Sequence, residues 1–174
     1  MKNTIIKFGL ISGGISAVFL FITMLIYKNI GFDKIGFENA AIYGYASMIL
    51  SMSVIYFGIK SYRDSQNEGS FSFGKGLLLG LGIMLISCIC YSLAWLVIYY
   101  NFFPTFMDDY ATLCIQKATK AGASQAELSQ KMIEMNQMKE YYKNPFSLFA
   151  LTLIEPTPVG ILIVLISAFV LRRK

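Results

Sequence analysis

Four long apolar runs constrain this chain more than any other feature of its sequence. They cover residues 8–27, 40–59, 76–103 and 146–171, and each holds at least 20 residues. At 1.5 Å of rise per residue, about 20 helical residues cross the roughly 30 Å hydrocarbon core of a bilayer. Because lipid offers the backbone no hydrogen-bond partner, each run is expected to be a helix. We therefore predict an all-α integral membrane four-helix bundle, in a single domain over residues 1–174.

The composition supports this class. The chain is 56% hydrophobic and 14% charged, against about 25% charged residues in soluble domains. The apolar runs also lack the polar periodicity of helices in a soluble bundle. The net charge of +5 comes with basic residues at the ends of the runs, where membrane topology explains them. The lipid bilayer is therefore the expected partner, and nucleic acid is not.

The charge distribution predicts an orientation. If the helices alternate sides, the polar turn at residues 60–75 and both chain ends share one face. That face carries eight basic residues: Lys2, Lys7, Lys60, Arg63, Lys75, Arg172, Arg173 and Lys174. The other face carries seven over a longer stretch, mostly far from a membrane end. By the positive-inside rule, we predict a multi-pass protein of the cytoplasmic (inner) membrane with both termini in the cytoplasm.

Small residues recur at helical spacing in two of the runs. Gly9, Gly13 and Ala17 follow one another every four residues in the first run, and Gly76 and Gly80 repeat that spacing in the third. Such faces allow close contact between membrane helices. They favour packing within the chain, in a homo-oligomer or with other membrane protein subunits.

The polar segment between the third and fourth runs predicts an outer helical hairpin over residues 105–143. Gly122 is expected to end its first helix, and Ser124 with Glu127 forms a capping box for the second. A stripe of apolar side chains follows in that second helix: Leu128, Met132, Met135 and Met138. This stripe is either the hairpin's own seam or an adaptable surface for a partner. In the first outer loop, a tandem pentapeptide is expected to form a short turn with Phe32 and Phe37 at the membrane interface.

The fourth run contains the sequence Glu155-Pro156-Thr157-Pro158. Pro156 and Pro158 cannot donate backbone hydrogen bonds, so the helix is expected to kink or break there. Helix rise places Glu155 about 13 Å below the outer membrane boundary. A carboxylate at that depth is expensive and suggests a functional site. The alternatives are a solvated carboxylate at the interface and a neutral or paired carboxyl used for packing.

Several short motifs together resemble a bacterial family of uncharacterised membrane proteins, domain-of-unknown-function family 4199. The motifs are residues 44–48 (GYASM), 57–64 (FGIKSYRD), 72–75 (SFGK), Pro104-x-Phe106 with Tyr110, 142–145 (YKNP), 158–160 (PVG) and 171–174 (LRRK). The resemblance covers nearly the whole chain. It implies a four-helix inner-membrane protein and brings no established activity. The usual member has Ala after the Phe-Gly-Lys sequence, where this chain has Gly76.

The sequence predicts no catalytic residues, metal site or cofactor. It contains no histidine, which removes the commonest general base and metal ligand. One polar group at the membrane turn is a candidate contact for a lipid headgroup or a cytoplasmic partner: Lys60, Tyr62, Arg63, Asp64 and Lys75. These residues could equally act as topology anchors with local ion pairing.

Two functions follow from these features. The first is a non-enzymatic scaffold or accessory subunit of a membrane complex, favoured by the small-residue faces and the outer hairpin. The alternative is a carrier or lipid-handling protein that uses Glu155 at a broken helix. An enzyme acting on lipid-linked substrates ranks below both, because no acid and base groups converge.

Overall fold

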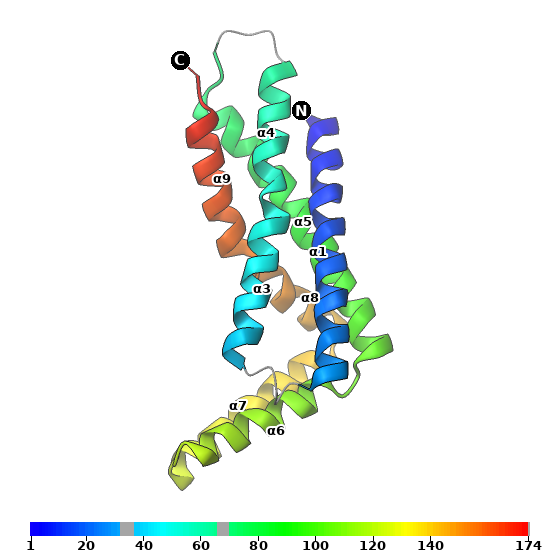
Figure 1. Cartoon of the computed structure of the whole chain (residues 1–174), viewed down its shortest axis with the longest axis vertical. Helices are drawn as coiled ribbons and strands as arrows, with labels where there is room; N and C mark the ends of the chain where they lie inside the picture. Colours follow the sequence, from blue (N-terminus) through cyan, green and yellow to red (C-terminus); the bar gives the residue numbers. More distant parts are fainter. Residues whose placement is uncertain (32–36, 66–69, 174) are drawn as a thin grey trace.

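The computed structural model describes residues 1–31, 37–65 and 70–173, without the side chains of residues 37–41. In this part of the chain nearly every residue is helical, and β-structure is limited to one isolated bridge. The all-α fold class is confirmed (Figure 1). The helices are α1 (Lys2–Ile30), α3 (Phe37–Met52), α4 (Val54–Ser65), α5 (Phe73–Phe102), α6 (Phe106–Lys120), α7 (Gln125–Lys143), α8 (Pro145–Ile154) and α9 (Thr157–Leu171). The side chains of Phe32 and Phe37, expected at the membrane interface, lie outside the described residues.

Four helical spans are long and apolar enough to cross a membrane. They are α1, the joined helices α3 and α4 from Ile42 to Ser65, α5, and the joined helices α8 and α9. The predicted membrane protein with four spans is therefore confirmed. Helices α1 and α5 extend a few residues beyond the predicted 8–27 and 76–103 at their starts, because polar flanking residues continue the helical hydrogen bonding. At the start of α5, the Ser72 side chain accepts a hydrogen bond from the Lys75 backbone N–H.

The second span is not the single helix predicted at residues 40–59. It is interrupted at Ser53, between α3 and α4, and it continues to Ser65. Ser51 and Ser53 donate their hydroxyls to the carbonyls of Met48 and Leu50, three residues back. Such bonds compete with the helical ladder and bend membrane helices. The run of apolar residues concealed this break, because serine is compatible with a membrane helix.

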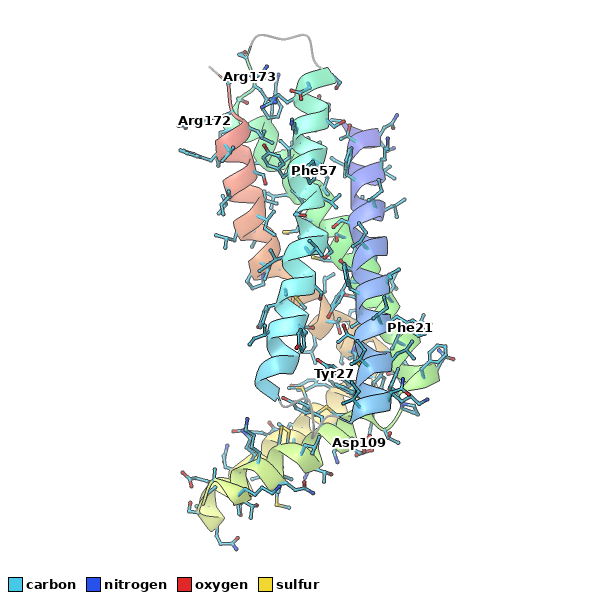
Figure 2. All side chains as sticks on the ribbon, viewed as in Figure 1. Phe21, Tyr27, Phe57, Asp109, Arg172 and Arg173 are labelled. Carbon is cyan, nitrogen blue, oxygen red and sulfur yellow. The ribbon has the colours of Figure 1, made fainter. Side chains whose placement is uncertain are left out.

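Helix α5 lies at the centre of the bundle and contacts α1, α4, α8 and α9. Helices α1 and α5 run parallel, since Gly9 and Gly13 of α1 face Ile86 and Cys90 of α5 in the same order. Both chain ends, the end of α4 and the start of α5 lie at one end of the bundle (Figure 1). Figure 2 shows Arg172 and Arg173 at that end and Asp109 at the opposite one.

The buried core has two parts, which we call the terminal half and the hairpin half. The terminal half, next to the chain ends, packs aliphatic side chains such as Ile59, Leu79, Ile83 and Val164, none of which is exposed. The hairpin half, next to α6 and α7, packs larger and more aromatic side chains: Met24, Tyr27, Trp95, Ile98, Tyr99 and Leu148.

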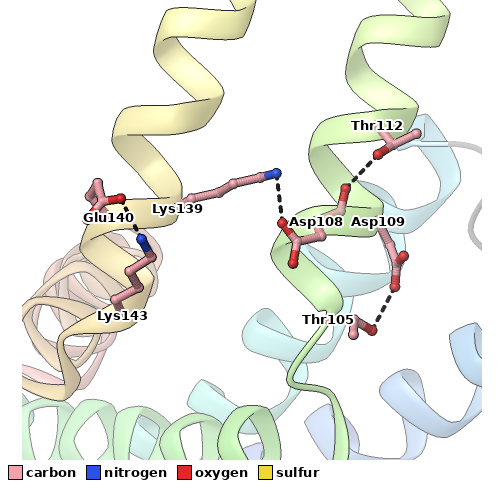
Figure 3. Close-up of polar contacts among 7 residues, drawn as sticks. All are labelled: Thr105, Asp108, Asp109, Thr112, Lys139, Glu140 and Lys143. Atoms are coloured by element: carbon pink, nitrogen blue, oxygen red, sulfur yellow. Dashed lines mark hydrogen bonds and ion pairs between the residues drawn. The ribbon is translucent and has the colours of Figure 1, made fainter.

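Helices α6 and α7 form the predicted hairpin, which lies obliquely across the end of the bundle (Figure 1). Gly122 has φ +80°, the left-handed conformation that ends α6. The capping box is complete, because the Ser124 hydroxyl accepts from the Glu127 N–H and the Glu127 carboxylate accepts from the Ser124 N–H. Lys139 of α7 pairs with Asp108 of α6 at 2.7 Å (Figure 3).

The methionine stripe of α7 does not form the hairpin seam as a whole. Met132 is 50% exposed and Met138 is 37% exposed. The partly buried face of α7 comprises instead Leu128, Lys131, Met135, Lys139 and Tyr142. The two lysines take seam positions because their long aliphatic stems cover apolar surface while the ammonium groups reach water. Sequence hydrophobicity alone assigns such positions to the methionines.

Candidate functional site

A cavity of about 200 Å³ lies inside the hairpin half, among all four spans. Its walls come from α1, α3 and α5, from the connection between α8 and α9, and from the hairpin. Polar and aromatic side chains dominate one part of the lining: Thr23, Ser47, Tyr91, Trp95, Tyr142 and Glu155. Glu155 is therefore brought together with residues that lie far from it in the sequence.

The connection that carries Glu155 is the predicted break in the fourth span. Helix α8 ends at Ile154, and α9 begins at Thr157. Pro156 and Pro158 interrupt the ladder because they have no N–H to donate. The Thr157 hydroxyl donates to the carbonyl of Leu153, four residues back, at 2.8 Å. The prolines thus shape the chain at the cavity, while Glu155 supplies its carboxylate.

The carboxylate of Glu155 has one hydrogen-bond partner among the described residues. The Tyr91 hydroxyl donates to Glu155 Oε2 over 3.4 Å, longer than the 2.5–3.0 Å of a strong O–H···O bond. The described residues that line the cavity include no lysine or arginine, and the ion pairs in the same part of the chain do not involve Glu155. The carboxylate therefore retains acceptor capacity toward the cavity.

The hairpin closes one side of the cavity with aromatic rings. The ring of Phe106 lies 5.2 Å from that of Trp95, edge to face, and Tyr142 lies 5.2 Å from Tyr99 in the same arrangement. The Tyr100 hydroxyl donates to the Tyr142 carbonyl at 2.9 Å, which fixes α7 against α5. Burial, and then the nearby Glu155 charge, raise the pKa of Tyr142 to about 12. This phenol stays protonated at physiological pH.

A second, larger recess opens beside the cavity on the outer surface of the bundle. It is an apolar groove of about 590 Å³ between α1 and α3. Thr23, Tyr27 and Ser47 line both the groove and the cavity. The groove thus adjoins the cavity through these shared residues and, in a bilayer, faces the acyl chains.

No pattern in the sequence connects the aromatic residues of this site with Glu155. Tyr91, Trp95 and Tyr99 are spaced four residues apart in α5, which places three rings on one helical face. Trp95 is 7% exposed and Tyr91 9%, so this face turns into the bundle. The spacing could have indicated the face, but not the partners that surround it.

The predicted small-residue positions lie at close helix contacts. A side chain at Gly9 or Gly13 would overlap Ile86 or Cys90 of α5. Gly76 lies 3.2 Å from Ala168 of α9, and Gly80 lies 2.9 Å from Val164, both measured from an ideal Cβ position. The fifth position, Ala17, lies instead beside a shallow apolar surface recess shared with α5.

In the described part of the chain, residues of the polar group at the membrane turn make local contacts. Arg63 is paired with its neighbour Asp64 at 2.7 Å, and Tyr62 packs against the buried Phe71 with ring centres 6.4 Å apart. Lys60 and Lys75 are exposed. The connecting residues 66–69 lie outside the described part of the chain.

A buried serine cluster was also missed from the sequence. The Ser12 hydroxyl donates to the Ser51 carbonyl at 2.9 Å and lies 2.9 Å from the Ser87 hydroxyl. All three serines are fully buried. The cluster joins α1, α3 and α5 next to the interruption at Ser53, where polar residues hold membrane helices together. Isolated serines in apolar runs gave no signal of this convergence.

The described residues include no group of three or more His, Cys, Asp or Glu side chains that could hold a metal ion. The carboxylates of α6 are occupied locally, because Asp109 accepts from Thr105 and Asp108 pairs with Lys139 (Figure 3). The cavity itself offers a carboxylate, hydroxyls and aromatic rings. This set can bind and orient a small group.

Comparison with known proteins gives a family but no activity. No curated protein and no solved structure matches the chain. The model of the family described as "Protein of unknown function (DUF4199)" matches residues 7–173, nearly the whole chain. The chain therefore belongs to the DUF4199 family of proteins of unknown function.

Proposed function

We propose that this protein is a non-enzymatic membrane binding protein that takes up an amphiphilic molecule from the bilayer. The observation that carries the proposal is the pair of adjoining recesses, a cavity with a carboxylate inside and an apolar groove outside. An amphiphile needs one polar and one apolar compartment in contact. The carrier role expected from Glu155 is thereby favoured over the scaffold role.

The route into the site runs sideways from the lipid. The groove between α1 and α3 is lined by apolar side chains such as Ile22, Ile26 and Leu50. Ile22 is 46% exposed and Leu50 59%, so an acyl chain could replace bilayer lipid at their surface without desolvation cost. Thr23 and Ser47 then supply hydroxyls where the groove meets the cavity.

Trp95 makes the proposal directly testable, because it is the sole tryptophan of the chain and lines the cavity. The full-length protein in discs of phosphatidylglycerol and an aliphatic polymer is titrated with 3-bromododecan-1-ol, whose bromine lies close to the head group and quenches tryptophan on contact. We expect saturable quenching of Trp95. Ala46→Phe, which fills the groove, should weaken binding at least about fivefold, whereas Val18→Phe on the exposed side of α1 should not. Linear quenching that is equal in all three proteins would reject the proposal.

We also propose that the chain ends lie in the cytoplasm and that the protein resides in the inner membrane. The support is the gathering of basic residues at the end that holds both termini (Figure 2). Cys114 of the hairpin is partly exposed. With Cys88 and Cys90 replaced by serine, a membrane-impermeant maleimide should label Cys114 in intact cells. Labelling only after permeabilisation would reverse the orientation.

A second candidate function is that of a scaffold or accessory subunit, with the hairpin as the contact. Helix α7 has no buried residue, and it exposes Met132, Ile133 and Tyr141 by half or more. Co-purification in mild detergent tests this function. A defined partner lost in the Ile133→Lys variant but kept in a Gln137→Lys variant would support it. A lone monomer in every preparation would reject it.

A further inference from the structure

The charge balance of the cavity points to the kind of molecule it accepts. Glu155 brings a carboxylate, and the described residues that line the cavity include no basic side chain. Its hydrogen bond from Tyr91 is long, at 3.4 Å. An ionisable group within a membrane span is stable only when it is neutral or paired. Since the described residues provide no cationic partner, the missing counter-charge is expected to arrive with the ligand.

The aromatic side chains that line the cavity also favour a cationic ligand. Among the described residues, five aromatic side chains border the cavity: Tyr27, Tyr91, Trp95, Phe106 and Tyr142. The faces of aromatic rings carry a negative quadrupole, which attracts ammonium groups and repels anions, and tryptophan is the strongest partner. A carboxylate surrounded by aromatic rings is the chemistry by which proteins recognise organic cations.

The sizes of the two recesses assign the two parts of the ligand. The cavity, at about 200 Å³, is smaller than the 300–1,000 Å³ of a site for a whole drug-sized ligand. It accommodates a head group. The groove, at about 590 Å³ and with an apolar lining, accommodates a hydrocarbon chain. Tyr27 lies at the junction of the two.

We propose that the cavity binds the ammonium group of a cationic amphiphile, paired with Glu155 and enclosed by aromatic rings, while its chain occupies the groove between α1 and α3. The proposal rests on the amphiphile-binding function above and names the ligand class of the same site. The ammonium group could belong to a membrane lipid or to a single-chain amine.

The test compares three heads on the same dodecyl chain, brominated at carbon 3 so that the bromine lies next to the head: trimethylammonium, alcohol and sulfate. Quenching of Trp95 is measured in phosphatidylglycerol discs for the wild type and for Glu155→Gln and Glu155→Asp. All three proteins see the same concentration of a given amphiphile in the bilayer, so the ratio of a variant's affinity to that of the wild type cancels differences in partitioning. We expect Glu155→Gln to weaken trimethylammonium binding at least about tenfold, to leave the alcohol within about twofold, and to improve sulfate binding. Glu155→Asp, which keeps the carboxylate, should retain part of the preference for trimethylammonium over the alcohol and the sulfate.

The outcomes separate this inference from the function on which it rests. Absence of saturable quenching with every head would reject the binding function itself. Saturable binding of the alcohol with no effect of Glu155→Gln on the cation, or a preference for sulfate, would overturn the ligand class alone. Competition by added phosphatidylethanolamine would assign the ammonium to a lipid headgroup. Competition by dodecylamine but not by phosphatidylethanolamine would assign it to a single-chain amine.

Discussion

The terminal and hairpin halves of the bundle use the same four spans in opposite ways. In the terminal half, glycines at Gly76 and Gly80 bring α5 onto α9, and unexposed aliphatic side chains fill the interface. In the hairpin half, the fourth span is broken, aromatic side chains take the place of aliphatic ones, and a carboxylate lines the cavity. Close packing in the terminal half stabilises the bundle. The hairpin half can therefore contain a polar cavity within the membrane.

The strongest test of this comparison fills a close contact. Gly13→Leu forces a side chain into Cys90 of α5 and should destabilise the fold by about 3 kcal/mol, the cost of overpacking a dense interface. Neighbouring Gly14 is the matched control, since a Cβ there meets nothing within 4 Å. Reversible unfolding in mixed micelles measures both variants. Equal losses at the two positions would mean that close packing of α1 on α5 does not hold the bundle together.

The next substitution places a large side chain in the cavity of the hairpin half. Gly44 lines the cavity, and a Cβ there meets nothing within 4 Å. Gly44→Phe should therefore change the free energy of unfolding by no more than about 1 kcal/mol. It should weaken binding of the brominated amphiphile in the cavity at least tenfold, which corresponds to about 1.4 kcal/mol. Unfolding and Trp95 quenching are read on the same preparation. A variant that unfolds while Gly14→Leu does not would show that the cavity half is also closely packed.

The serine cluster, which lies between the two halves, should contribute less. Ser87→Ala removes the hydroxyl next to Ser12 and should cost about 1 kcal/mol, typical of a hydrogen bond between membrane helices. Ser92 on the same helix is the control, because its buried hydroxyl has no hydrogen-bond partner in the described part of the chain. Ser92→Ala should be neutral or stabilising. The opposite ranking in the unfolding assay would contradict the role of the cluster.

The smallest effect concerns the hairpin and its dependence on pH. Hydrogen bonds from the backbone N–H of Ser124, and then from its hydroxyl, lower the pKa of Glu127 below the ordinary 4.5. A lowered folded-state pKa stabilises the hairpin above about pH 4.5, and this contribution disappears as the pH falls through the lowered value. Amide exchange near the start of α7, corrected for intrinsic rates, should therefore speed up below pH 4.5. Glu127→Gln should lack this step; its persistence there would assign the step to another group.

Much of this fold is visible in the sequence, because the strongest forces on it are local. The length of each apolar run determines its span, and Pro156 and Pro158 break α8 from α9 wherever the helix packs. The capping box at Ser124 involves only neighbouring residues. In contrast, the interruption at Ser53 depends on which backbone carbonyl accepts the hydrogen bond of each serine hydroxyl. The hydrophobicity of the sequence does not predict that partner.

Only part of the candidate site could be predicted from the sequence. Glu155 could be recognised because a carboxylate in an apolar run is expensive anywhere in the membrane. Tyr91, Trp95 and Tyr142 could not be joined to it, since they come from α5 and α7 and meet only through tertiary packing. The same limit explains the methionine stripe, because exposure of Met132 depends on how α7 is rotated against α6.

The isolated bridge between Phe71 and Arg173 has a consequence for biosynthesis. The two residues exchange backbone hydrogen bonds of 3.0 and 2.9 Å, and the Phe71 ring is 3% exposed. Arg173 lies about a hundred residues after Phe71 in the sequence, and a ribosome adds that many residues in roughly 5–20 s. The residue just before α5 thus acquires this backbone partner only after the fourth span has been synthesised, and a truncation that removes Arg173 leaves the third span without this contact.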